Sequence, residues 1–176
     1  EKFKIGKYTL LNSHFLLRRF LWYLNIDINL IHKYDYLLLS DCRDVYFQNN
    51  PFERYSLGDE FIVSGYEPEL IKNNKINKNW LIEAYNSDPL IYRQLLNSKI
   101  ICAGVTFGSK SLIFDYLKKM EKEIKRFIFI NESTSITNLD QIFHNKIFHF
   151  EGNKEYSVDY SDKFISTIGF DNRFDI

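Results

Sequence analysis

A short, uninterrupted apolar run that leads straight into charged residues is the feature that most constrains how this chain folds. The segment "YDYLLLS", residues 34–40, has polar flanks and is followed at once by "DCRD". A run of this length is typical of a strand covered on both faces. We therefore expect a central strand here, with the carboxylates of Asp41 and Asp44 at its carboxyl end.

Helical and strand-like segments alternate along the rest of the chain. Strand-like runs occupy residues 60–66, 99–109, 149–158 and 163–170, of which 99–109 is either one strand with a glycine break or a strand pair. Helical spacing and capping residues predict helices at residues 12–25, 88–97, 109–126 and 137–147. The polar stretch at 73–80 is interpreted as a surface loop. This alternation predicts an α/β layered domain, and such sheets bind ligands beyond the carboxyl ends of their strands.

Composition narrows the class of protein. The 176 residues suffice for one domain, and Lys plus Arg equals Asp plus Glu at 23 each, which removes the electrostatic reason to expect a nucleic-acid partner. No apolar run approaches the roughly 18 residues of a membrane span. Cys42 and Cys102 lie in no metal-binding spacing. Reduced thiols and the absence of a signal-peptide pattern favour a cytoplasmic location, with peripheral membrane association left open.

Asp41 and Asp44 can share a cation only if the chain turns after Ser40. Residues three apart on a continuing strand face opposite sides, whereas in a helical turn or tight loop they face one side. Mg²⁺ and Mn²⁺ prefer carboxylate oxygens and keep water or phosphate oxygens in their remaining positions. On spacing alone, the alternative is an ordinary charged turn in which Asp41 caps the turn and Arg43 pairs with Asp44 at the surface.

Three segments, in order, resemble the GT-A fold of nucleotide-sugar-dependent glycosyltransferases. "YLLLSDCRDVYFQNNPF", 36–52, resembles the family's metal-binding segment, in which a hydrophobic strand ends in an Asp-x-Asp or Asp-x-x-Asp motif. "ICAGVTFGSKSLIFDYLKKM", 101–120, resembles a glycine-containing strand and its following helix, and "NLDQIFHNKIFH", 138–149, resembles an Asp-Gln segment. The resemblance implies a GT-A-like layered α/β/α domain with a mixed central sheet. Residues 1–176 would form its central and C-terminal part, with the strands of the nucleotide pocket upstream.

The resemblance also implies roles for individual side chains. Asp41 and Asp44 would bind the metal, and Asp140 would act as the catalytic residue that orients or deprotonates the acceptor hydroxyl. The segment "FLLRRFLWYLNI", 15–26, resembles the arginine-bearing helix that precedes the metal strand in this family, so Arg19 (or its neighbour Arg18) would bind the donor. The other donor-binding residues would be Ser40, Arg43 and Gly104. The residues that line the acceptor side would be Cys102, Ala103 and Gln141. Cys102 stands where the family usually has Asn, and His149 is the nearest candidate for a third metal ligand.

The function that follows is a metal-dependent glycosyltransferase that uses Mn²⁺ or Mg²⁺. It would move a sugar from a nucleotide-sugar donor to a glycan, lipid or protein acceptor, with the cation neutralising the departing diphosphate. One alternative is a non-catalytic glycosyltransferase-like binding domain. Another is a metal-dependent phosphatase or phosphotransferase, which Arg43 disfavours because that chemistry commonly needs a second carboxylate two residues after the first.

Overall fold

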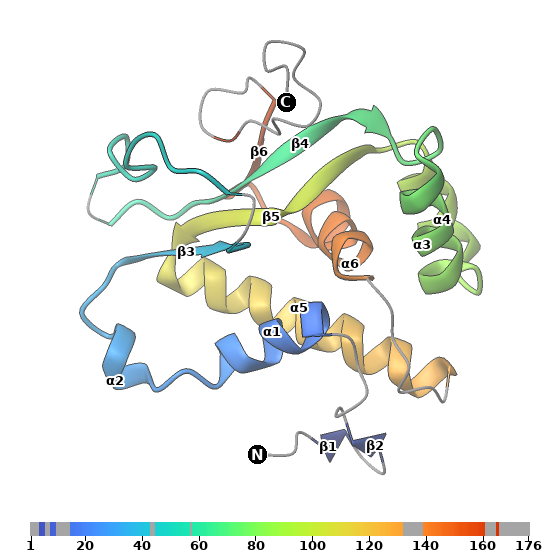
Figure 1. Cartoon of the computed structure of the whole chain (residues 1–176), viewed down its shortest axis with the longest axis horizontal. Coiled ribbons are helices and arrows are strands. Elements are labelled where there is room, and N and C mark those ends of the chain that lie inside the picture. The colour runs from blue at the N-terminus through green and yellow to red at the C-terminus, as the bar shows by residue number, and fades with distance from the viewer. Residues whose placement is uncertain are drawn as a thin grey trace.

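The computed structural model describes residues 4–5, 8–9, 15–42, 45–56, 58–131, 139–160 and 165. They form an α/β structure around a four-stranded mixed sheet of order β3-β5-β4-β6 (Figure 1). The strands are β3 (Tyr36–Ser40), β4 (Ile62–Leu70), β5 (Lys99–Ser109) and β6 (Tyr156–Asp159). β5 is antiparallel to both β3 and β4, and β6 is parallel to β4. A separate two-stranded sheet pairs β1 (Lys4–Ile5) with β2 (Tyr8–Thr9).

The structure confirms most of what the helical spacing and capping residues predict. They are α1 (Phe15–Leu24), α2 (Ile28–Ile31), α3 (Lys75–Tyr85), α4 (Pro89–Leu96), α5 (Lys110–Asn131), α6 (Asp140–Lys146) and the π-helix η2 (Ile147–Glu151). The side chain of Asp88 caps α4 by accepting from the N–H of Ile91 at 3.1 Å, and Pro89 follows as the first helical residue. The predicted starts of α1 and α6, at residues 12–14 and 137–138, lie outside the described residues.

The prediction of a surface loop at 73–80 is wrong, because most of this stretch belongs to α3. Asn74 is the N-cap, and its side-chain oxygen accepts from the N–H groups of Ile76 and Asn77 at 3.1 and 3.0 Å. The asparagine that suggested a loop therefore starts a helix. The helix becomes apolar on one face only after its first turn, where it buries Leu81, Ala84 and Tyr85.

Within the described residues, the segment 34–40 does not form the central strand that its sequence predicted. There β3 lies at the edge of the four-stranded sheet and pairs only with β5, and all five of its residues are half-buried. Leu37 and Leu39 pack against the main core, whereas Tyr36 and Leu38 pack on the opposite face. A continuous apolar run indicates that both faces of a strand are covered. It carries no information on whether both edges are paired.

The two faces of the sheet are covered differently. Helices α1, α5 and α6 lie on one side of the sheet (Figure 1). The buried side chains of Ile62 and Ile101 belong to the main core together with residues of these helices. On the other face, Val63 and Phe107 belong to a smaller hydrophobic cluster. Its other members are Tyr36, Leu38, Phe52, Tyr55, Phe61 and Ile165. The second helical layer of the expected α/β/α arrangement is not among the described residues.

The strands near the C-terminal end differ in part from the prediction. Residues 99–109 form one continuous strand, the first of the two alternatives. The predicted strand at 149–158 forms only as β6, because the helix continues through η2, where Ile147 and Phe148 are buried, and ends before Gly152. The predicted strand at 163–170 lies outside the described residues, apart from Ile165.

Candidate functional site

Arg19 on α1 joins two carboxylates that are far apart in the sequence. Its Nη1 donates to Oδ1 of Asp41, and its Nη2 donates to Oδ2 of Asp140 at 3.0 Å. Nη2 also lies 3.5 Å from the carbonyl oxygen of Ala103 on β5. We call Arg19, Asp41, Asp140 and this carbonyl the Arg19 cluster. Four of the ten predicted site residues therefore meet at one guanidinium.

Backbone pairing with β5 positions Asp41. It directly follows β3, and its N–H donates to the carbonyl of Gly104 at 2.8 Å, so the pairing of the two strands continues one residue past Ser40. A Cβ on Gly104 would lie 3.3 Å from Oδ2 of Asp41 and 3.4 Å from Sγ of Cys102. The missing side chain therefore leaves room beside the carboxylate.

Asp140 and Gln141 are positioned by the start of α6. Asp140 is the first residue of that helix and is 6% exposed. The Oε1 of Gln141 accepts from the N–H of Ala103 at 3.4 Å, and its Nε2 donates to Glu67 and Asn77 at 3.1 Å each. Glu67 and Asn77 are buried polar residues that the sequence did not single out, since neither belongs to a recognisable motif and Asn77 lies in the polar stretch interpreted as a surface loop.

Asn145, one turn after Gln141, attaches α6 to β5. Its Oδ1 accepts from the N–H of Ile101 and its Nδ2 donates to the carbonyl of the same residue, both at 2.8 Å. The β4–β5 ladder is irregular in this region, with register shifts on both sides of Tyr66. There Oγ of Ser64 lies 2.9 Å from the carbonyl oxygens of both Cys102 and Val105, which share its one proton. Side chains thus satisfy backbone groups where strand pairing is interrupted.

Burial and charge act against each other in the Arg19 cluster. Burial alone would lower the pKa of Arg19, but Asp140 and Asp41 outweigh it and the pKa is raised. Burial raises the pKa of Asp140, and the guanidinium opposes that rise. Arg19 is therefore a fixed cation between two acidic groups, and Asp140 holds a proton more readily than an exposed aspartate does.

A buried histidine supports the cluster from the core. Tyr116 and Ser64 contact the two ring nitrogens of His144, with Tyr116 Oη 2.8 Å from Nδ1 and Ser64 Oγ 3.1 Å from Nε2. All three residues are at most 1% exposed. Burial, aided by the nearby Arg19 cation, lowers the pKa of His144 to about 3. The ring is neutral at physiological pH, so one nitrogen can donate and the other accept.

The proposed pair of metal ligands is described only in part. Asp41 has a 34% exposed side chain, whereas Arg43 and Asp44 lie outside the described residues, so the convergence of the two aspartates is not observed. Among the residues that are described, no group of three or more His, Cys, Asp or Glu side chains could hold a metal ion. The Nε2 of His149 donates to the carbonyl of Lys99 at 2.9 Å, and His149 does not join the cluster.

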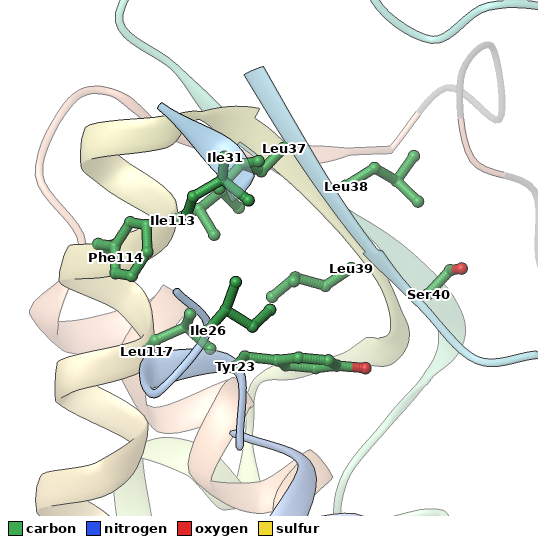
Figure 2. Close-up of a pocket in the computed structure, with 10 residues that line it drawn as sticks. All are labelled: Tyr23, Ile26, Ile31, Leu37, Leu38, Leu39, Ser40, Ile113, Phe114 and Leu117. Atoms are coloured by element: carbon green, nitrogen blue, oxygen red, sulfur yellow. The ribbon is translucent and has the colours of Figure 1, made fainter. Parts of the chain in front are cut away.

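An apolar cavity of about 240 Å³ lies beside β3 (Figure 2). Leu39 points into it together with side chains from the α1–α2 segment and from α5, including Tyr23, Ile26, Ile31, Ile113 and Leu117. Leu38 and Ser40 point to the opposite side of the strand (Figure 2). Among the described residues no charged side chain lines this cavity, and its apolar lining does not suit a nucleotide diphosphate.

Comparisons with protein-family models, curated proteins and solved structures found no match to this chain. None of the helices in the described residues combines the length and apolar character that crossing a bilayer requires. Neither Cys42 nor Cys102 forms a disulfide bond, and Cys42 is exposed.

Proposed function

We propose that this chain is part of a divalent-metal-dependent glycosyltransferase of the GT-A type. It transfers a sugar from a nucleotide-sugar donor to a glycan, lipid or protein acceptor. One observation carries the proposal: positions 19, 41, 103 and 140 belong to four separate segments and meet in the Arg19 cluster. Each of these positions had been assigned to the site by its sequence segment alone. An arbitrary set of core contacts has no reason to select them together.

The donor set suits Mn²⁺ or Mg²⁺. Arg19 donates to Oδ1 of Asp41, and Oδ2 of Asp41 faces the space left open at Gly104. Asp41 and Asp44 would hold the cation, because hard cations prefer carboxylate oxygens and leave positions for phosphate oxygens. When bound, the cation supplies Lewis-acid stabilisation to the diphosphate leaving group.

The chain's own residues divide the remaining tasks. Arg19 places a guanidinium at the same carboxylate, where it can also bind a phosphate oxygen of the donor. Ser40 and Arg43 lie on either side of Asp41 in the sequence. Asp140 has a pKa raised by burial, which makes it a better proton acceptor for an acceptor hydroxyl. Gln141 holds the backbone at Ala103, and Cys102 and Gly104 line the site beside it.

The edge position of β3 agrees with the upstream strands that the resemblance implies. The outer edge of β3 has no strand partner in the part of the chain that the structure describes, and the apolar cavity opens beside it. A further strand paired there would satisfy the free backbone groups of β3. It would also bring nucleotide-binding residues next to Asp41.

The test is ligand-induced stabilisation of the full-length gene product. Mn²⁺ together with the correct nucleotide sugar should raise the melting temperature, while neither does so alone. At about 100 times Kd the stabilisation should reach about 2.7 kcal/mol. Asp41→Asn should abolish it. The matched control is Asp115→Asn on α5, because Asp115 is also a half-exposed aspartate in an ion pair, with Lys119 at 2.6 Å.

A second variant separates chemistry from binding. Asp140→Asn should keep the metal-dependent stabilisation but lower the transfer rate by about 10²–10⁴, the usual contribution of a general base. The rate would be followed by release of the nucleoside diphosphate. If no combination of metal and nucleotide sugar stabilises the full-length protein, the proposed function is wrong and the Arg19 cluster is a structural ion network.

A further inference from the structure

Three different elements bind the side-chain amide of Gln141, one at its oxygen and two at its nitrogen. Its oxygen accepts from the N–H of Ala103 on β5, and its nitrogen donates to Glu67 on β4 and to Asn77 on α3. The backbone that it holds is adjacent to Gly104, whose carbonyl binds the N–H of Asp41. The amide therefore lies between the strand that supports Asp41 and the helix that begins with Asp140.

Glu67 and Ala103 together determine which way this amide faces. The N–H of Ala103 can only donate, so the amide oxygen faces it, and the carboxyl group of Glu67 accepts from the amide nitrogen. Glu67 is 8% exposed, and its burial raises its pKa, which the hydrogen bond from Gln141 opposes. A carboxyl group this buried is costly without a hydrogen-bond partner, and Gln141 provides one.

Asn77 reinforces the same orientation from α3. Its Oδ1 is the second acceptor for Nε2 of Gln141, and its own Nδ2 lies 3.2 Å from Oδ1 of Asn74. Asn74, the N-cap of α3, in turn donates to Glu69 at 2.9 Å. Two carboxylates on β4 thus serve different purposes: Glu67 binds Gln141 directly, while Glu69 anchors the start of α3.

We propose that Glu67 is a positioning residue of the candidate site. Through Gln141 it sets the backbone at residues 102–104 and the first turn of α6, and so the spacing of Asp41, Gly104 and Asp140. Its effect on sugar transfer rests on the proposed function above. Its effect on the geometry of this segment does not, so the two can be tested separately.

The half-buried thiol of Cys102 reports on this geometry without any substrate. In a Cys42→Ser background, the rate of Cys102 alkylation by iodoacetamide would be measured where circular dichroism shows every variant to be folded. Glu67→Ala should raise the alkylation rate about tenfold, because the loss of one buried hydrogen bond should raise the population of conformers with an accessible thiol by about that factor. Glu67→Gln should stay close to the parent rate, because its amide oxygen can accept the same bond.

Glu69→Ala is the matched control, since it removes a hydrogen-bonded carboxylate from the same strand without touching Gln141. It should leave the Cys102 rate unchanged. If Glu67→Ala does not fold, Gln141→Met removes the same hydrogen bonds at similar side-chain length and should give the same increase. Equal rates for the Glu67→Ala and Glu69→Ala variants, or a Glu67→Gln rate as high as that of Glu67→Ala, would overturn the positioning role.

Kinetics extend the test where transfer is measured. Glu67→Ala should lower kcat about tenfold with less than a twofold change in donor KM, and Glu67→Gln should restore kcat, because only the placement of the reacting groups is disturbed. A change in donor KM alone would overturn this part of the proposal. A Cys102 response without any nucleotide-sugar binding would support the positioning of the segment and contradict the proposed function.

Discussion

At the scale of single residues, two glycines on β5 have different reasons to lack a side chain. A Cβ on Gly108 would lie 2.3 Å from the carbonyl oxygen of Phe61 and 2.8 Å from Cα of Ile62, which is backbone that cannot move aside. A Cβ on Gly104 would meet Oδ2 of Asp41 at 3.3 Å, a side-chain atom that can shift by a few tenths of an ångström. Gly108 is therefore needed for β4 to approach β5, and Gly104 for open space at the candidate site.

We predict that Gly108→Ala lowers the free energy of unfolding by at least about 2 kcal/mol, because the added methyl forces the strands apart. Gly104→Ala should cost less than about 1 kcal/mol, since only the Asp41 carboxylate has to move. Urea denaturation of the two variants measures both effects. Equal losses would contradict the distinction between a packing glycine and a site glycine.

At the scale of secondary-structure elements, a single side chain couples α6 to the sheet. Asn145 is fully buried and binds both the N–H and the carbonyl of Ile101, and its Nδ2 also donates to the carbonyl of Gln141 at 2.7 Å. The helix that carries Asp140 is thereby held in register with the strand that carries Ala103. The positions of the two therefore depend on one asparagine rather than on apolar packing alone.

Asn145→Ala should destabilise the fold by about 3 kcal/mol, because it leaves a buried peptide N–H and carbonyl without partners. Asn97→Ala is the control: Asn97 is exposed and its side chain also bonds a carbonyl, that of Arg93 at 3.2 Å. That variant should change stability by less than about 0.5 kcal/mol. Thermal unfolding followed by circular dichroism compares them, and a similar loss in both would mean that Asn145 is not a structural link.

At the scale of the whole molecule, the main core contains ionisable groups that folding keeps in one protonation state. Burial alone would raise the pKa of Glu123, but hydrogen bonds from Lys146 and Tyr85 at 2.8 and 2.6 Å hold it below its usual value. His144 is kept neutral in the same core, with its pKa lowered to about 3. The stability of the fold therefore depends on pH through groups that lie far from the surface.

The sign of the His144 contribution follows from its lowered pKa. Below about pH 6.5 the unfolded chain protonates this ring and the folded chain does not, so the stabilisation present at neutral pH is lost as the pH falls towards 3. Between pH 7 and pH 5 this residue should account for about 2 kcal/mol of lost stability. His144→Asn should be less stable at pH 7 but show a correspondingly flatter pH dependence.

The control for that experiment is His32→Asn, which changes an exposed histidine on the C-terminal side of α2. Its pH dependence should match that of the unmodified chain. Chemical denaturation at a series of pH values between 7 and 5 gives the slopes. A slope in the His144→Asn variant equal to that of the unmodified chain would contradict the proposed source of the pH dependence.

Much of the fold and of the candidate site could be predicted from local pattern. The spacing of Leu112, Ile113, Tyr116, Leu117 and Met120 is helical, and Asp88-Pro89 is a helix start, so α4 and the start of α5 were expected where they occur. α5 continues to Asn131, beyond the predicted end at residue 126. The segments that contain Arg19, Asp41, Ala103 and Asp140 were also singled out. Glu67 and Asn77 could not be found this way, because nothing in their local sequence distinguishes them from exposed polar residues until folding buries them side by side.

Local patterns predicted most of the helices and strands and singled out the short segments of the candidate site, because periodicity, capping and motifs depend on neighbouring residues. The position of β3 at the edge of the described sheet followed instead from contacts between distant parts of the chain. The tertiary structure also decided that one guanidinium joins Asp41 to Asp140. Edge position and side-chain partners depend on contacts between residues 22 to 121 positions apart, such as those of Arg19. No local pattern encodes those contacts.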